Sequence, residues 1–284
     1  MTSGTSVERS GDVKSVGFIG LGSQGLPMAH RIVDGGYELH LWARRPTSVA
    51  PFSGKPIVVE DTPAALGAAC QIVGLCVVND DDVRQVAFEH GLVAAMAPGS
   101  ILAVHATVTP GLMDELAAAA EPHGVDVIDA PVSGGEVAAA EGHLTVMCGG
   151  DPAVIERARP VLETFGDPVR RLGGLGSGLI SKILNNGLFT ANLGLAHDTI
   201  RIGTALGLDP AALTAVLITG SASSTGLISH DRLFTPAGAT HGGRLLEKDV
   251  RLLREMTTAL GASMVERVAA ETVDLLVEAS TSTD

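Results

Sequence analysis

The stretch Val16-Gly17-Phe18-Ile19-Gly20-Leu21-Gly22-Ser23-Gln24-Gly25 decides the fold of the first half of this chain. A short apolar run ends at the first glycine of a G-x-G-x-x-G pattern, and an amphipathic segment follows directly. Between a strand and a helix, the first glycine permits a tight turn, the second lets backbone approach a pyrophosphate, and the third allows close helix packing. The residues expected to bind a dinucleotide at this helix N-terminus are Gly20, Leu21, Gly22, Ser23, Gln24 and Gly25.

Two arginines follow the second apolar run, Glu38 to Ala43, which is the second expected strand. An acidic residue at the end of this strand would bind the ribose hydroxyls of NAD. Arg44 and Arg45 stand there instead, and guanidinium groups hold phosphate well. The sequence therefore favours NADP, with NAD possible, and the alternative is that both arginines are ordinary surface charges.

Short apolar runs alternate with helix-like segments through the rest of the first half. The runs are Ile57–Val59, Ile72–Val78, Ile101–Val104 and Val125–Ile128, and helices are expected to begin near Asp61, Asp80 and Thr109. This order predicts an α/β Rossmann domain, which is a doubly wound, mainly parallel sheet with helices on both faces. The carboxyl ends of the strands, around Val78-Asn79 and His105 to Thr107, would line the cofactor crevice.

Three consecutive carboxylates, Asp80, Asp81 and Asp82, resemble a metal cluster. Consecutive residues at a helix start cannot all converge on one ion. A helix cap with a favourable dipole interaction is the better interpretation, and no metal site is expected.

The second organising stretch is Gly176-Ser177-Gly178-Leu179-Ile180-Ser181-Lys182-Ile183-Leu184-Asn185-Asn186. On a helix, Lys182 and Asn186 lie one above the other on an otherwise apolar face. Burial of a lysine beside a ligand would lower its pKa from about 10.4 and let it exchange protons. The alternative is a lysine that extends its ammonium group to water, beside an asparagine that bonds its neighbours.

Beyond Asn186 the pattern contains helices only. One long run extends to Leu206, and others begin at Pro210, lie around Ser229, and cover Glu247–Leu260 and Ser263–Glu278. We therefore expect a flexible tail over 1–12, a cofactor domain over 13–175, and an all-α substrate and dimerisation domain over 176–284 that begins with a long inter-domain helix. A long apolar helix cannot bury itself alone, so a homodimer or higher homo-oligomer is expected.

The composition limits the partners of this 284-residue chain, whose formal net charge is -13. No basic stripe for nucleic acid is present, and no apolar stretch reaches the roughly 20 residues of a membrane span. The three cysteines form no C-x-x-C pair, which indicates a reducing cytoplasm.

Four motifs in order resemble the β-hydroxyacid dehydrogenase family, and in particular its members of the 3-hydroxyisobutyrate dehydrogenase type. They are Gly20–Gly25 with the following Leu-Pro-Met-Ala, Asp129–Gly135 with Gly142–Gly150, Gly176–Asn186, and Lys248-Asp249. The resemblance implies that Lys182 is the catalytic lysine and that Asn186 orients a small carboxylated substrate. It also implies the remaining roles: Ser133, Gly134 and Gly135 hold the substrate carboxylate, while Lys248, Thr107 and the backbone of Val78 and Asn79 contact the cofactor.

The chain departs from the family pattern near the nicotinamide. The family often has Leu-Pro where this chain has Val78-Asn79, and Ser-Thr or Ser-Ser near His105 to Thr107. These changes leave the identity of the substrate open, and they affect the expected class of reaction less. Contact with substrate is the alternative for His105 in such a place, but a structural role is favoured for it, for His197 in the helical run, and for His241 in a glycine-rich loop.

The resulting expectation is an NADP-preferring enzyme that transfers hydride reversibly between the nicotinamide and a small 3-hydroxy acid or semialdehyde, with Lys182 as general acid and base. Two alternatives remain. One is an imine reductase on the same fold, and the other is an NADP-binding dimer without turnover. The retained Lys182 and Asn186 count against both, because the related proteins of those two kinds lose the lysine.

Overall fold

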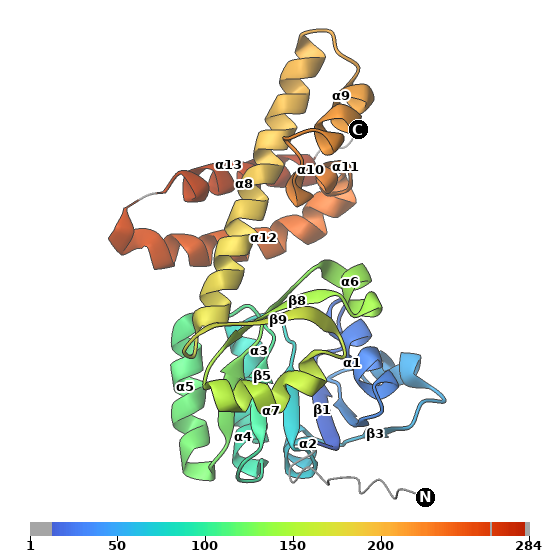
Figure 1. Ribbon diagram of the computed structural model, residues 1–284, viewed down its shortest axis with the longest axis vertical. Coiled ribbons are helices and arrows are strands. Elements are labelled where there is room, and N and C mark those ends of the chain that lie inside the picture. Colours follow the sequence, from blue (N-terminus) through green and yellow to red (C-terminus); the bar gives the residue numbers. More distant parts are fainter. Residues whose placement is uncertain (1–12, 262, 282–284) are drawn as a thin grey trace, which may run out of the picture. The chain divides into compact units, whose positions relative to one another are not determined.

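The computed structural model describes residues 13–261 and 263–281, so the expected tail over 1–12 lies outside the described part (Figure 1). The chain divides into two compact units between Ile180 and Ser181. This division falls inside a helix, α8, whereas the sequence places the boundary at the start of that helix. Unit 1 runs from blue to yellow-green in Figure 1, and unit 2 from yellow to red.

Unit 1 contains one mainly parallel sheet, as predicted. Its strands are β1 (Ser15–Ile19), β2 (Glu38–Trp42), β3 (Ile57–Val59), β4 (Ile72–Leu75), β5 (Ile101–Val104), β6 (Asp126–Asp129), β7 (Val132–Ser133), β8 (Leu144–Gly149) and β9 (Gly166–Gly173). The spatial order is β3-β2-β1-β4-β5-β6-β8-β7, with β9 paired to β8. Strands β1 to β6 pair in parallel, and β8 runs antiparallel to β6 and β7.

Helices cover both faces of this sheet, because its buried strands carry apolar side chains on both sides. Unit 1 has helices α1 (Gly25–Asp34), α2 (Pro63–Ala69), α3 (Asp80–Arg84), α4 (Leu92–Ala95), α5 (Pro110–Ala120), α6 (Gly135–Glu141) and α7 (Pro152–Leu162), with short turns at Pro46–Phe52, Gln85–Glu89 and Glu121–His123. One core joins α1, α6 and α7 to the sheet, and a second core joins α2, α3, α4 and α5 to it. Strand β1, and with it the glycine loop, lies between the two cores.

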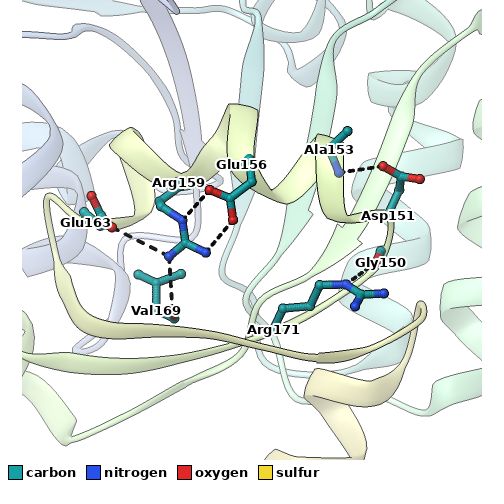
Figure 2. A network of polar contacts seen from close by, with 8 residues as sticks. All are labelled: Gly150, Asp151, Ala153, Glu156, Arg159, Glu163, Val169 and Arg171. Carbon is teal, nitrogen blue, oxygen red and sulfur yellow. Dashed lines mark hydrogen bonds and ion pairs between the residues drawn. The ribbon is translucent and has the colours of Figure 1, made fainter.

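Two arginines hold the last strand of unit 1, one through α7 and one through the residue that follows β8 (Figure 2). Arg159 donates to the main-chain oxygen of Val169 at 3.2 Å and pairs with Glu156 at 2.7 Å. Arg171 Nε donates to the main-chain oxygen of Gly150 at 3.1 Å. These contacts fix β9, which leads directly into the glycines that precede α8.

Unit 2 is helical. It contains most of α8 (Ser177–Ala205), then α9 (Pro210–Thr219), α10 (Thr225–Ile228), α11 (His230–Leu233), α12 (Pro236–Thr257), a short turn at Thr258–Leu260, and α13 (Met264–Thr281). Glycines let the long helices approach closely. A Cβ on Gly187 of α8 would lie 2.5 Å from Leu253 of α12, and one on Gly194 would lie 2.0 Å from Thr272 of α13. None of the helices in the described ranges combines the length and apolar character that a membrane crossing requires.

Three sequence expectations about the elements were wrong in detail. Strand β4 stops at Leu75 rather than Val78, and β8 and β9 were not foreseen as strands. Helix α12 begins eleven residues before Glu247, so His241 lies within a helix and not in a loop. Gly242 serves close packing there, because a Cβ at this position would lie 2.6 Å from Leu233.

Candidate functional site

The glycine loop between β1 and α1 has the geometry that its pattern predicts. Gly20 has a φ of +104°, and a Cβ there would lie 2.1 Å from the main-chain oxygen of Cys76. A Cβ on Gly25 would lie 1.9 Å from the main-chain oxygen of Gly20, whereas one on Gly22 would meet nothing within 4 Å. Gly20 and Gly25 therefore permit the tight turn, and Gly22 leaves open space beside the backbone.

The N-terminus of α1 is suited to an anion. Gln24 precedes the helix without a capping hydrogen bond from its side chain, and the first turn holds no acidic residue. The side-chain nitrogen of Gln24, Nε2, is buried and has no acceptor among the described residues. Open backbone N–H groups at a helix start attract phosphate, and an unpaired buried donor awaits an acceptor. This loop fits the pyrophosphate of a dinucleotide.

Both arginines after β2 are exposed. Arg44 Nη2 lies 2.7 Å from Oδ1 of Asp82, which belongs to the first turn of α3. No carboxylate follows β2 in the sequence, yet the fold brings that of Asp82 to Arg44 from another element.

Three further residues expected to line the cofactor follow strands of unit 1, whereas Lys248 belongs to α12 in unit 2. Val78 is 60% exposed after β4, and Thr107 follows β5. The side chain of Asn79 caps α3 by accepting a hydrogen bond from the Asp82 N–H at 2.8 Å. The three aspartates therefore form the first helical turn, and the cap that we expected of them is Asn79 instead.

Ser133, Gly134 and Gly135 connect β7 to α6 within unit 1. Gly134 and Gly135 have φ values of +136° and +76°, which side chains rarely adopt. The start of α6 has no side-chain cap, and Glu136 stands in its first turn. Two of the three expected carboxylate-binding residues thus depend on being glycine.

His105 is structural. Its ring is buried between those of Phe18 and Phe165, with distances of 5.9 and 5.5 Å between ring centroids. Its Nδ1 lies 2.7 Å from the main-chain oxygen of Ala130. Burial lowers the pKa of His105 to about 4, against the effect of that hydrogen bond. The imidazole is therefore neutral at physiological pH and donates from Nδ1 to the carbonyl.

The main polar cluster of unit 2 forms between α8 and α12. Asn186 Nδ2 donates to Asp249 Oδ2 at 2.5 Å, and Lys248 Nζ lies 3.1 Å from Asp249 Oδ1. Asn186 Oδ1 also accepts from Asn185 at 3.0 Å. An asparagine amide carries two N–H donors, so one remains for another acceptor. Lys182 is half-buried on the same face of α8, one turn before Asn186.

The electrostatics of this cluster act on Lys182. Burial lowers the pKa of the Lys182 ammonium group, the Asp249 carboxylate opposes that change, and the Lys248 ammonium group adds to it. A lowered pKa brings a lysine closer to the range in which it exchanges protons at neutral pH. Lys248 also lines a groove of about 520 Å³, where four basic side chains, Arg244, Lys248, Arg251 and Arg254, outnumber the two acidic ones, Glu247 and Asp274.

Sequence reasoning missed two carboxylates. No role was predicted for Asp249, although its place beside Lys248 was a signal. It accepts a hydrogen bond from Asn186 and forms an ion pair with Lys248. Asp129 is fully buried and accepts hydrogen bonds from the N–H groups of Gly176 at 2.7 Å and Leu179 at 2.8 Å. It fills the N-terminus of α8, the helix that carries Lys182.

Other nucleophiles and metal ligands are not grouped into a site. All three cysteines are free, and burial raises the pKa of each thiol to about 12. Within residues 13–261 and 263–281, no three His, Cys, Asp or Glu side chains come together as metal ligands would. His197 stacks on Phe234 at 3.9 Å, and its Nδ1 lies 3.1 Å from Nε2 of His230.

Comparison with known proteins agrees with this arrangement. Residues 15–187 match the family model of the NAD binding domain of 6-phosphogluconate dehydrogenase. Residues 176–283 match the model described as NAD-binding of NADP-dependent 3-hydroxyisobutyrate dehydrogenase.

Curated and solved relatives span nearly the same length. The 2-hydroxy-3-oxopropionate reductase of Escherichia coli is 31% identical over 88% of this chain and 86% of its own. The NAD-dependent L-serine dehydrogenase of Pseudomonas aeruginosa is 30% identical over 88% of each chain. The solved structure of Psf3 in complex with NADP+ and 2-OPP is 27% identical, with a TM-score of 0.81, and covers 93% of this chain and 94% of its own.

Proposed function

Since the chain belongs to the β-hydroxyacid dehydrogenase family, we propose that it transfers hydride reversibly between NADP and a small 3-hydroxy acid or the corresponding semialdehyde. Unit 1 is an NAD(P)-binding domain, and the protein is an NAD(P)-dependent hydroxyacid dehydrogenase. The observation that carries the proposal is the cluster of Lys182, Asn186, Lys248 and Asp249, which places a lysine of lowered pKa beside an anchored amide.

In the proposed reaction the nicotinamide, when bound, supplies or accepts the hydride. Lys182 Nζ, in its neutral form, accepts the hydroxyl proton during oxidation, and its ammonium form returns that proton during reduction. Asn186 donates its second amide hydrogen to the reacting oxygen, while Asp249 holds the amide in place. Asp249 also keeps enough negative charge near Lys182 for the ammonium form to remain accessible.

The substrate carboxylate is assigned to the Ser133-Gly134-Gly135 turn, because it leads into α6, whose N-terminus has no side-chain cap, and a Cβ on Gly135 would meet nothing within 4 Å. In this acidic protein a local anion site is needed, because the net charge of -13 repels anions at a distance. Apolar contacts would discriminate the substituent on the substrate only weakly, since one methylene is worth about 1–3 kcal/mol.

The preference for NADP over NAD rests on Arg44 and Arg45. Two exposed guanidinium groups at the end of β2 provide more donors than one 2′-phosphate requires. Replacement of Arg44 by alanine is expected to weaken the binding of NADPH more than that of NADH. Equal losses for both nucleotides would make the arginines bystanders.

The assembly is proposed to be a homodimer or a higher homo-oligomer in a reducing cytoplasm. Four large apolar side chains of α8 are about half exposed in unit 2: Leu184, Leu188, Leu195 and Ile202. They recur at helical spacing, which suits a partner helix. Light scattering after gel filtration tests this proposal, and a monomer at micromolar concentration would contradict it. The three free thiols support the compartment.

A spectrophotometric screen tests the reaction. The wild-type protein is incubated with NADPH or NADH and a panel of small semialdehydes, hydroxy acids and cyclic imines. Oxidation of NADPH by a carboxylated aldehyde is the expected result. Activity on imines alone would transfer the chain to the imine reductases, and tight cofactor binding without turnover on any compound would favour a non-catalytic dimer.

A further inference from the structure

The ion pair between Arg44 and Asp82 lies across the cofactor edge of unit 1. Arg44 follows β2, and Asp82 lies just beyond β4 in the first turn of α3. Strands β2 and β4 flank β1 on its two sides, with parallel registers. The pair therefore joins the two neighbours of the strand from which the Gly20–Gly25 loop leaves, where the ribose next to adenine binds in such a fold.

The two members of the pair are held differently. The side chain of Asp82 is 17% exposed and that of Arg44 is 66% exposed. The backbone of Asp82 is fixed because its N–H donates to the Asn79 side chain. Arg44 contacts Asp82 through Nη2, whereas a guanidinium carries five N–H donors. Asp82 is thus the fixed partner, and Arg44 is the adaptable one.

We propose that Asp82 is a selectivity residue for the nucleotide. This inference rests on the cofactor part of the proposed function. A carboxylate near the ribose accepts hydrogen bonds from the 2′-hydroxyl of NAD and repels the 2′-phosphate of NADP. In this chain the carboxylate comes from the start of α3 and not from the end of β2.

The site therefore carries two opposed devices. Arg44 and Arg45 favour the 2′-phosphate, whereas Asp82 neutralises Arg44 and adds a negative charge beside that phosphate. The preference for NADPH is smaller than the arginines alone would give, and Asp82 sets how much smaller. The competing explanation is an ordinary surface ion pair, which contributes little to stability and nothing to selectivity.

The test compares the dissociation constants of NADPH and NADH by calorimetry. The variants are Asp82→Asn, which keeps the shape of the side chain, and Asp81→Asn as a matched control. Asp81 lies one residue earlier in the same turn and is exposed. Its replacement makes the same change in charge without touching Arg44. Circular dichroism confirms that each variant folds.

For Asp82→Asn we expect NADPH to bind about fivefold more tightly, with NADH unchanged or about twofold weaker. The gain shrinks as salt rises from about 0.02 M to 0.3 M, because exposed charges are screened. Asp81→Asn shifts both nucleotides equally and by less than about twofold. In an Arg44→Ala background, the effect of Asp82→Asn falls, since the two residues act together.

An unchanged ratio of the two constants in Asp82→Asn, or the same change in Asp81→Asn, would overturn the role of Asp82. If the wild-type protein binds neither nucleotide, the cofactor proposal itself is wrong. The two failures are therefore distinct.

Discussion

The start of α8 depends on one buried carboxylate, and replacement of Asp129 by asparagine tests how much. Asp129 accepts hydrogen bonds from the N–H groups of Gly176 and Leu179 at 2.7 and 2.8 Å, so both carboxylate oxygens are used. Asparagine offers one acceptor oxygen and turns an NH₂ group toward the other N–H. The variant therefore loses one hydrogen bond and leaves a buried backbone donor unpaired.

The magnitude follows from opposing terms. Hydrogen bonds to a charged group contribute about 1.5–3 kcal/mol each, and an unpaired buried donor costs about 1–3 kcal/mol. Burial raises the pKa of the Asp129 carboxyl, the N–H groups act in the opposite direction, and loss of the buried charge offsets part of the cost. We expect the variant to be less stable by about 2–4 kcal/mol at neutral pH.

Urea unfolding followed by circular dichroism measures this loss, and Asp151→Asn is the matched control. Asp151 caps α7 by accepting from the N–H groups of Ala153 at 2.8 Å (Figure 2) and of Val154 at 3.2 Å. Unlike Asp129, it is exposed. Asparagine caps a helix about as well as aspartate, so this control loses only the favourable charge at the helix N-terminus, about 0.3–1 kcal/mol. Turnover should also fall in Asp129→Asn alone, because Lys182 lies one turn beyond Leu179 on the same helix. Equal effects in the two variants would refute the reasoning.

Three further predictions concern the helix that carries Lys182. Asp249→Asn removes a charge that raises the pKa of Lys182, so the pH at which oxidation reaches half its maximum rate should fall; Asp274→Asn, an exposed control, should leave it unchanged. Burial lowers the pKa of Lys182 in the folded state, so the charged lysine destabilises the fold at pH 7, and this cost disappears as the pH rises toward the unfolded pKa of about 10.4. Lys182→Met should therefore be more stable than wild type at pH 7 and lose that advantage toward pH 10, as measured by urea unfolding. Gly178→Ala places a Cβ 2.1 Å from the main-chain oxygen of Met147, so a lower melting temperature with a loss of about 1–3 kcal/mol is expected, and an unchanged one would mean that the helix start can shift freely.

Most of unit 1 could be predicted from the sequence because its signals are local. The glycine loop, the parallel strands and the proline-marked helix starts each depend on neighbouring residues, and the structure has them at the expected places. Strand β9 carries Arg170 and Arg171 and has no apolar run, so periodicity could not reveal it. The start of α12 was missed because glycine is read as a helix breaker, whereas Gly242 is required there by Leu233.

The carboxylates of the candidate site could not be placed from the sequence, since their partners are distant along the chain. Asp129 is 47 residues from Gly176, and Asp82 is 38 residues from Arg44. An aspartate at the end of a strand has many possible partners, and only the folded sheet selects one. Lys182 and Asn186 could be paired from the sequence, because helical spacing alone puts them on one face of the helix.

The most direct test of the account is the turnover of Lys182→Ala with NADPH and the best carboxylated aldehyde of the panel, measured together with the binding of NADPH. General acid and base catalysis contributes about 10²–10⁴-fold, so we expect turnover to fall at least a hundredfold while the dissociation constant of NADPH changes by less than about twofold. Added primary amine should restore part of the rate, because it replaces the missing proton donor. Turnover close to that of the wild type would contradict the assignment of Lys182.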